Sequence, residues 1–169
     1  GNVFHGYFSG WLTRVFVWMK RHAARRTDRI IELTPGGVEE HLAEGIGRRE
    51  QYRVIFSGID TKPFESAAAR RTAMRAALGV GEGEILIGGV GRLEPIKGFT
   101  YFVEAARAVC ACDPGGRFVL AGSGSEREAL AAQAQALGGR FRFLGLRRDV
   151  PELMAALDVL VAPSINEGM

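Results

Sequence analysis

Six short runs of apolar or β-branched residues alternate along the chain with segments in which apolar residues recur at helical spacing. The runs cover residues 29–33, 52–56, 85–90, 117–121, 141–144 and 158–162. Short strands that alternate with helices are typical of βα units, in which the strands form a parallel sheet. We therefore predict an α/β fold, with a parallel sheet that carries helices on both faces.

Local signals mark where some of the helices begin and end. Thr34 followed by Pro35 is typical of a helix start, and Gly45 is typical of its end. We expect a further helix over residues 66–78, ended by Gly79. One side of a later helix is predicted from an apolar repeat at Phe99, Phe102, Val103, Ala106 and Cys110.

Two further helix starts are predicted from side chains three residues apart. Ser125 with Glu128, and Asp149 with Glu152, have the spacing of a capping box, in which each side chain bonds a backbone N–H of the first turn. Both pairs follow a predicted strand directly. We therefore expect each strand to lead through a short loop into a capped helix.

The segment 57–64 has no helical periodicity and contains both Gly58 and Pro63, so it is the expected domain boundary. We assign residues 1–60 to the end of a first domain and residues 61–169 to a second domain. Because the chain begins with Gly1 and ends in a loop-like sequence, we expect an internal fragment that is incomplete at both ends.

Composition excludes several classes of protein. Of 169 residues, 47% are hydrophobic and 24% are charged, which excludes a disordered chain, and the 23 glycines show no triplet period, which excludes collagen. No apolar run approaches the ~18 residues that span a bilayer. Cys110 and Cys112 would point to different sides of a helix, so we expect neither a disulfide nor a metal site, as in a reducing cytoplasm.

Positive charge is concentrated near the start of the chain. Residues 1–29 hold six basic side chains and one acidic one, whereas the remaining residues hold 16 basic and 18 acidic side chains. The basic segment also contains Trp11 and Trp18. Basic and aromatic residues together are found where proteins touch anionic membranes or nucleic acids, and also on solvated helix faces. The pattern alone leaves these three interpretations open.

Three polar loops follow predicted strands, where parallel sheets bind their ligands. They are residues 91–98, 122–124 and 163–168. The first combines Gly91, Arg92 and Lys97 with the start of a helix near Gly98. Glycines, two cations and unpaired helix N–H groups together favour a diphosphate site, although two surface charges beside a turn would give the same pattern.

The other loops are less specific. Residues 122–124, Gly-Ser-Gly, either bring backbone N–H groups to a nucleotide or only form a strand-to-helix turn. Glu167 is a candidate for binding hydroxyls or for catalysis, and His5 is a candidate at a strand end. We expect His22 and His41 to be solvated. No spacing of His, Cys and Asp indicates a metal site.

Five segments, taken in order, resemble glycosyltransferase family 4, the group 1 glycosyltransferases of the GT-B fold. The first-loop sequence Val90-Gly91-Arg92-Leu93 with Lys97-Gly98 is similar to the family's donor-diphosphate signature. The others are residues 28–31, 54–60, 118–124 and 158–164 with Glu167-Gly168. Ser57 and Phe56 stand where the family usually has asparagine and proline. The resemblance covers essentially the whole chain and implies a Rossmann-like sheet in each domain.

The resemblance implies roles for individual residues. Arg92 and Lys97 would hold the diphosphate of a nucleotide-sugar, Glu167 would lie by the donor sugar, and His5 would reach across from the first domain. Gly91 would bind the donor as well, and the residues Gly122, Ser123 and Gly124 together with the loop 145–149 would line the nucleotide side, with Arg147 near the base. The implied reaction is a retaining, metal-independent transfer of a sugar to an acceptor hydroxyl, for carbohydrate biosynthesis.

Partners and location follow from the same interpretation. We expect a nucleotide-sugar donor as substrate, no separate cofactor, a sugar or lipid-linked acceptor, no nucleic acid, and contact with a membrane surface through residues 11–29. The expected location is the cytoplasm, at or near a membrane. A nucleotide-sugar epimerase of the same architecture and a non-catalytic nucleotide-binding module are the alternative functions. The fragment itself is expected to be inactive, because most of the acceptor domain precedes Gly1.

Overall fold

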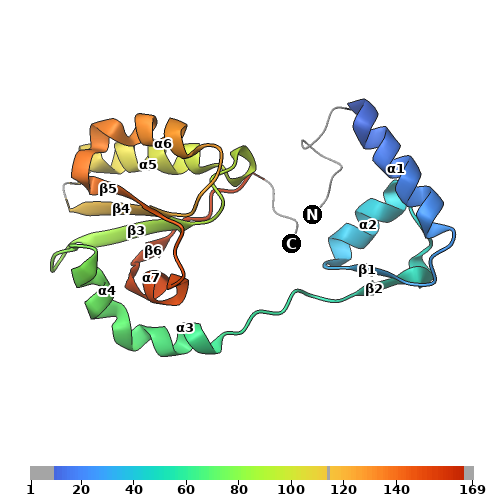
Figure 1. Cartoon of the computed structure of the whole chain (residues 1–169), viewed down its shortest axis with the longest axis horizontal. Helices are drawn as coiled ribbons and strands as arrows, with labels where there is room; N and C mark the ends of the chain where they lie inside the picture. The colour runs from blue at the N-terminus through green and yellow to red at the C-terminus, as the bar shows by residue number, and fades with distance from the viewer. Residues whose placement is uncertain (1–9, 114, 166–169) are drawn as a thin grey trace. The chain divides into compact units, whose positions relative to one another are not determined.

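The computed structural model describes residues 10–113 and 115–165, which form two compact units (Figure 1). Unit 1 contains the described residues up to Ile59, and unit 2 begins at Asp60. Each unit is an α/β arrangement of its own. His5 and Glu167 lie outside the described residues.

Unit 1 is built on a short pair of parallel strands. Strand β1 (Ile30–Glu32) pairs with β2 (Tyr52–Val54), with Ile30 opposite Tyr52. Helix α1 (Gly10–Ala24) precedes the strands, and α2 (Pro35–Ala43) connects them. The predicted start of α2 is confirmed, because the Thr34 hydroxyl accepts a hydrogen bond from the N–H of Gly37 at 3.0 Å.

Polar side chains connect the elements of unit 1. The Gln51 side chain donates to the carbonyl of Ala24 at 2.9 Å, at the end of α1. His41 is buried, so the expectation that it is solvated is wrong. Its Nε2 lies 3.1 Å from the Lys20 ammonium, and its Nδ1 lies 2.7 Å from a Glu32 carboxylate oxygen. Since an ammonium only donates, this Nε2 accepts from Lys20, and Nδ1 is the ring nitrogen beside the Glu32 carboxylate. Burial lowers the pKa of His41.

Unit 2 has a four-stranded parallel sheet in the order β5-β4-β3-β6. The strands are β3 (Ile85–Val90), β4 (Gly116–Ala121), β5 (Phe141–Gly145) and β6 (Val159–Leu160). All six predicted strands are present; β1, β2 and β6 are shorter than expected, β3 has the expected bounds, and β4 and β5 are each one residue longer. The shortest, β6, pairs with β3 at only two positions, Ile87 with Val159 and Gly88 with Leu160.

Helices cover both faces of this sheet, as predicted (Figure 1). Helices α5 (Phe99–Cys112) and α6 (Arg127–Ala134) lie on one face, over a core in which the rings of Phe102, Phe118 and Phe141 all contact one another. The predicted apolar side of α5 is confirmed. Helices α4 (Arg71–Ala77) and α7 (Val150–Ala156) cover the other face, where Leu86 and Leu153 are fully buried.

The helix expected over residues 66–78 is broken into two. Helix α3 (Lys62–Ala67) is followed by a 3₁₀ turn at Ala68–Arg70 and then by α4. Three arginines in this region pair with acidic groups far away in the sequence: Arg70 with Glu152 on α7, and Arg71 and Arg75 with Asp158, directly before β6. An Ala- and Arg-rich sequence reveals neither these pairs nor the break.

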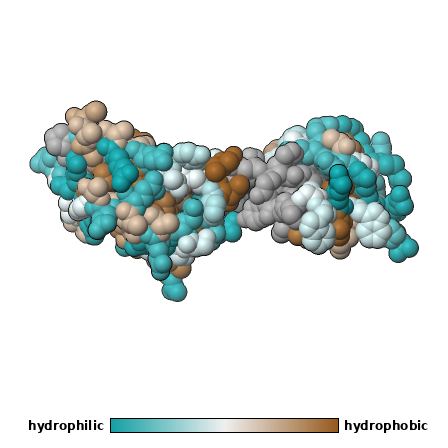
Figure 2. All heavy atoms as spheres, turned by 90° about the horizontal axis from the view of Figure 1, so that it is seen from above, coloured by the Kyte–Doolittle hydropathy of each residue, from teal (hydrophilic) through white to brown (hydrophobic). Residues whose placement is uncertain are grey.

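The surface seen in Figure 2 is mostly hydrophilic over both units, with hydrophobic side chains in small separate groups. Several large apolar side chains are nevertheless exposed. Trp11 and Trp18 on α1 are 69% and 66% exposed, and Leu146 after β5 is 79% exposed. Within residues 10–113 and 115–165, no helix is long and apolar enough to cross a membrane.

Candidate donor-binding site

Three loops of unit 2 meet at one edge of the sheet. Because β3, β4 and β6 are parallel neighbours, the segments that follow them emerge at the same edge. Backbone hydrogen bonds join these segments directly. Leu93 joins the first two segments: its N–H donates to the carbonyl of Ser123, and its carbonyl accepts from the N–H of Glu126, both at 2.9 Å. The N–H of Ile165, after β6, donates to the carbonyl of Ile96 at 2.9 Å.

Glycines allow these loops to approach each other closely. A Cβ placed on Gly122 would lie 1.8 Å from the carbonyl oxygen of Gly91, and one on Gly124 would lie 2.3 Å from that of Leu93. In the same way, a Cβ on Gly98 would lie 2.3 Å from the carbonyl oxygen of Pro163. These atoms belong to the backbone and cannot rotate away, so any side chain would separate the loops.

A side-chain contact closes the same junction. One carboxylate oxygen of Glu94 accepts from the Ser125 hydroxyl at 2.7 Å, and the other accepts from the Ser125 backbone N–H at 3.2 Å. These bonds lower the pKa of Glu94, and the nearby Arg92 lowers it further. The capping box expected for Ser125 is therefore wrong: its hydroxyl bonds Glu94, and α6 begins after Glu126 without a side-chain cap.

A small pocket of about 250 Å³ opens between these loops and the one after β5. It is lined by Val90, Gly91, Arg92, Ala121, Gly122, Ser123, Leu146, Arg147 and Val150. Five residues expected from the sequence thus lie together: Gly91, Arg92, Gly122, Ser123 and Arg147. Because Arg92 is exposed, its guanidinium is accessible to a ligand in solvent.

Lys97 and Gly124 are near this pocket in the fold but are not among the described residues that line it. Lys97 ends the 3₁₀ turn Pro95–Lys97, directly before Gly98, which has a φ of 63° and precedes α5. The predicted helix start near Gly98 is confirmed. A lysine beside the N-terminus of a 14-residue helix adds a charge to the partial positive charge of that terminus.

Arg147 is held in place by its neighbour. Two of its nitrogens, Nε and an Nη, donate to the two carboxylate oxygens of Asp149 at 2.7 and 2.5 Å. This bond lowers the pKa of Asp149. The capping box expected for Asp149 is wrong as well, since this carboxylate pairs with Arg147 and makes no side-chain cap to α7.

The sequence reasoning did not recognise the apolar wall of the pocket, although Leu146 lies in the loop 145–149 that was expected to line it. Leu146 and Val150 lie on either side of Arg147 in the chain, and both line the pocket. The sequence did contain an indication of this wall, because Leu146 is an apolar residue in a loop that is otherwise rich in charge. Flat apolar surface beside a fixed guanidinium is suited to an aromatic ring.

No group of three or more His, Cys, Asp or Glu side chains within residues 10–113 and 115–165 is placed to hold a metal ion. The described part of the site instead offers backbone N–H groups, arginine and lysine. Such an arrangement at the carboxyl edge of a parallel sheet is suited to an anionic ligand.

Comparison with known proteins gives the family. The family described as "Glycosyl transferases group 1" matches residues 84–169. The chain is 32% identical, over 92% of its length, to a UDP-Gal:alpha-D-GlcNAc-diphosphoundecaprenol alpha-1,3-galactosyltransferase of Escherichia coli, and covers 41% of that protein. It is 34% identical, again over 92% of its length, to a 2-deoxystreptamine N-acetyl-D-glucosaminyltransferase of Streptomyces fradiae, of which it covers 38%.

A solved structure is similar to this chain as well. Anabaena Alr3699/HepE, crystallised in complex with UDP and glucose, superposes with a TM-score of 0.76 and 29% identity, over 95% of this chain and 44% of that one. The chain therefore belongs to the group 1 glycosyltransferases and has the architecture of the GT-B fold. It spans about two fifths of the length of the curated relatives cited here.

Proposed function

We propose that unit 2 is the donor-binding part of an enzyme that transfers a sugar from a nucleotide-diphosphate donor to an acceptor hydroxyl. The observation that carries this proposal is the pocket that brings Arg92, the two glycine loops and Arg147 together in a chain of this family. Unit 1 would then be the end of the acceptor-side domain, with the boundary near residue 60.

Arg92 and Lys97 would bind the diphosphate. Both belong to the segment between β3 and α5, and the N-terminus of α5 points its unpaired N–H groups toward the same segment. When the bond from the sugar to the phosphate breaks, negative charge develops on the leaving diphosphate. Two cations and a helix N-terminus would stabilise that charge in a preorganised way. They would also supply the charge that a divalent ion supplies elsewhere, which supports metal-independent transfer.

The base of the nucleotide would occupy the pocket of about 250 Å³ beside Leu146 and Arg147. The Asp149 carboxylate fixes the guanidinium plane of Arg147, so a base could stack on it or on the apolar wall. Uridine is the first base to test, because the Anabaena structure contains UDP and the E. coli relative is named for UDP-Gal.

Glu167 and His5 complete the proposal through the family resemblance. Glu167 would lie by the donor sugar and His5 would reach the same sugar from the other domain, in a retaining reaction. The acceptor would be a sugar or a lipid-linked sugar; the E. coli relative is named for a diphosphoundecaprenol-linked sugar. Such an acceptor would bring the enzyme to the cytoplasmic face of a membrane, through contacts of residues 11–29.

Calorimetric titration of this chain with UDP, ADP and GDP tests the donor site directly. We expect Arg92→Gln and Lys97→Gln each to weaken binding of the preferred nucleotide by at least about tenfold, the loss of one charge-assisted bond. Arg107→Gln on α5 and Lys62→Gln on α3 are matched controls, because both side chains are exposed and lie outside the site.

Turnover is then measured in the polypeptide extended to the length of its relatives. Single substitutions of Arg92 and Lys97 should lower kcat/KM by at least about tenfold if they stabilise the leaving diphosphate. Near-normal turnover in both variants would refute the assignment. Epimerised nucleotide-sugar formed without acceptor would point to the epimerase alternative.

A further inference from the structure

The exposed side of α1 carries a continuous apolar stripe. Trp11, Val15, Trp18 and Met19 are 69%, 41%, 66% and 52% exposed. At 3.6 residues per turn these positions fall on one side of the helix, roughly opposite the buried residues Val17 and Ala24. The ring of His22 stacks on Trp18 with centroids 5.9 Å apart and extends the same side. We call these four apolar residues the tryptophan stripe.

Basic residues flank the tryptophan stripe. Arg14 lies along one edge of the stripe, and Arg25 and Arg26 follow directly after Ala24, the last residue of α1; all three are exposed. The sequence from residue 10 to residue 27 contains no Asp or Glu. An apolar centre with basic edges is the pattern of a helix that lies in the plane of a membrane surface.

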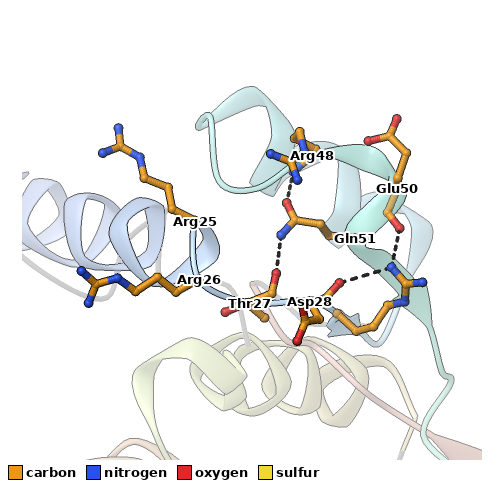
Figure 3. Close-up of a pocket in the computed structure, with 8 residues that line it drawn as sticks. Arg25, Arg26, Thr27, Asp28, Arg48, Glu50 and Gln51 are labelled. Atoms are coloured by element: carbon orange, nitrogen blue, oxygen red, sulfur yellow. Dashed lines mark hydrogen bonds between the residues drawn. The ribbon is translucent and has the colours of Figure 1, made fainter.

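The end of α1 adds a basic pocket of about 560 Å³, lined by Arg25, Arg26, Thr27, Asp28, Arg29, Arg48, Glu50 and Gln51. In Figure 3, dashed lines connect Gln51 to Arg48 and Thr27, whereas Arg25 and Arg26 extend away from this group and carry no such bond. With four arginines and two carboxylates, the pocket has a net positive charge. The two extended arginines are thus placed to bind phosphates.

We propose that α1 binds the surface of an anionic phospholipid bilayer through the tryptophan stripe. The two indoles would lie at the boundary between headgroups and acyl chains, where tryptophan is enriched. Arg14, Arg25 and Arg26 would contact lipid phosphates beside them. This inference concerns unit 1 alone and does not require that unit 2 bind a nucleotide.

Charge distinguishes a bilayer from other occupants of the stripe. A symmetric pairing of α1 with a second copy would bring the same arginines of both copies together, which is unfavourable. A nucleic acid would satisfy the arginines but would leave Val15 and Met19 without an apolar partner. An anionic bilayer satisfies both the apolar centre and the basic edges.

Tryptophan fluorescence reports on this surface specifically, because Trp11 and Trp18 are the two tryptophans of the chain. Vesicles of phosphatidylcholine, with and without phosphatidylglycerol, are added to the protein. We expect the emission to shift to shorter wavelength with the anionic vesicles and to be quenched by lipids brominated in the acyl chains. Raising the salt concentration should weaken the binding, because exposed charges are screened.

Flotation of the same vesicles measures the effect of substitutions. We expect Trp11→Ala with Trp18→Ala to lower the partition coefficient by at least about tenfold. Arg25→Gln with Arg26→Gln should lower it by about fivefold for each charge removed. Tyr101→Ala, which removes a 57% exposed aromatic side chain from α5, is the matched control and should leave it unchanged.

Several results would overturn the proposal. The first is an emission spectrum that anionic vesicles do not change. Others are equal binding to neutral vesicles, or a double tryptophan variant that binds as tightly as the original protein. If sedimentation instead shows a dimer that the tryptophan variants dissociate, a second copy covers the stripe and the proposal is wrong. Circular dichroism confirms that each variant is folded, and UDP titration of the same samples reports separately on the donor site.

Discussion

Gly122→Ala is the substitution that most directly tests how the loops of the donor site are held. Gly122 has a φ of 144°, and a Cβ there would lie 1.8 Å from the carbonyl oxygen of Gly91. Since this oxygen belongs to the backbone, the segment that carries Arg92 must move. We therefore expect the variant to lose both stability and affinity for a nucleoside diphosphate.

The size of the effect follows from two contributions. A non-glycine residue held in this backbone region costs about 1–3 kcal/mol. Displacing a close-packed neighbour costs about 1–3 kcal/mol more. A free-energy loss of about 2 kcal/mol, the lower end of the sum, lowers the Tm of a domain of this size by about 10 °C.

Two other glycines separate these contributions. Gly79 has a φ of 65° but no atom within 4 Å of the added Cβ, so Gly79→Ala introduces backbone strain alone. At Gly139 the added Cβ meets nothing within 4 Å, and no left-handed φ is involved. Thermal unfolding followed by circular dichroism should give the largest loss for Gly122→Ala, less for Gly79→Ala, and almost none for Gly139→Ala. Only Gly122→Ala should also weaken UDP binding in calorimetry. The reasoning is refuted if Gly122→Ala matches Gly139→Ala in both measurements.

Two further predictions concern acidic side chains. Burial opposes ionisation of Asp158, but the N–H of Leu86 and the guanidinium groups of Arg75 and Arg71 outweigh it and lower the pKa from 3.8 to about 2. Asp158 therefore stabilises the fold above pH ~4, and this contribution is lost as the pH falls through ~2. Because the Asp158 side chain is 31% exposed, we expect Asp158→Asn to lower the free energy of unfolding, measured in urea at neutral pH, by only about 1–2 kcal/mol. The difference between variant and original protein should disappear in acid. A difference that does not change with pH would contradict the ion pairing. Glu94→Ala removes both hydrogen bonds to Ser125, whereas Ser125→Ala removes only the bond from the hydroxyl. Each should weaken UDP binding several-fold, and the double variant should be no weaker than Glu94→Ala alone, because that substitution already removes the whole contact. Additive losses in calorimetry would show that the two residues act separately.

The strands could be predicted from the sequence because each is a short apolar run between polar loops. The same is true of the edge at which the loops meet, since the carboxyl ends of parallel strands share one edge. Gly91, Arg92, Gly122 and Ser123 follow directly from that rule, whereas Arg147 was expected from the family resemblance; the pocket brings all five together. The roles of these five residues, like those of Lys97 and Gly124, stay predictions.

The errors arise where a side chain has a partner far away in the sequence. Ser125 and Asp149 have the spacing of helix caps, yet stronger partners, Glu94 and Arg147, take their side chains. His41 lies on the nine-residue helix α2, too short for its pattern to distinguish buried from exposed, and it is buried between Lys20 and Glu32. Local spacing contains no information about such contacts.

The two sides of the pocket are built in different ways. Around Arg92 the backbone is fixed by close glycine contacts and by hydrogen bonds between loops, so almost any exchange there disturbs its neighbours. Leu146, by contrast, is 79% exposed at the end of β5, the edge strand of the sheet. Substitutions at position 146 can therefore change the shape of this wall of the pocket during divergence without disturbing the backbone around Arg92.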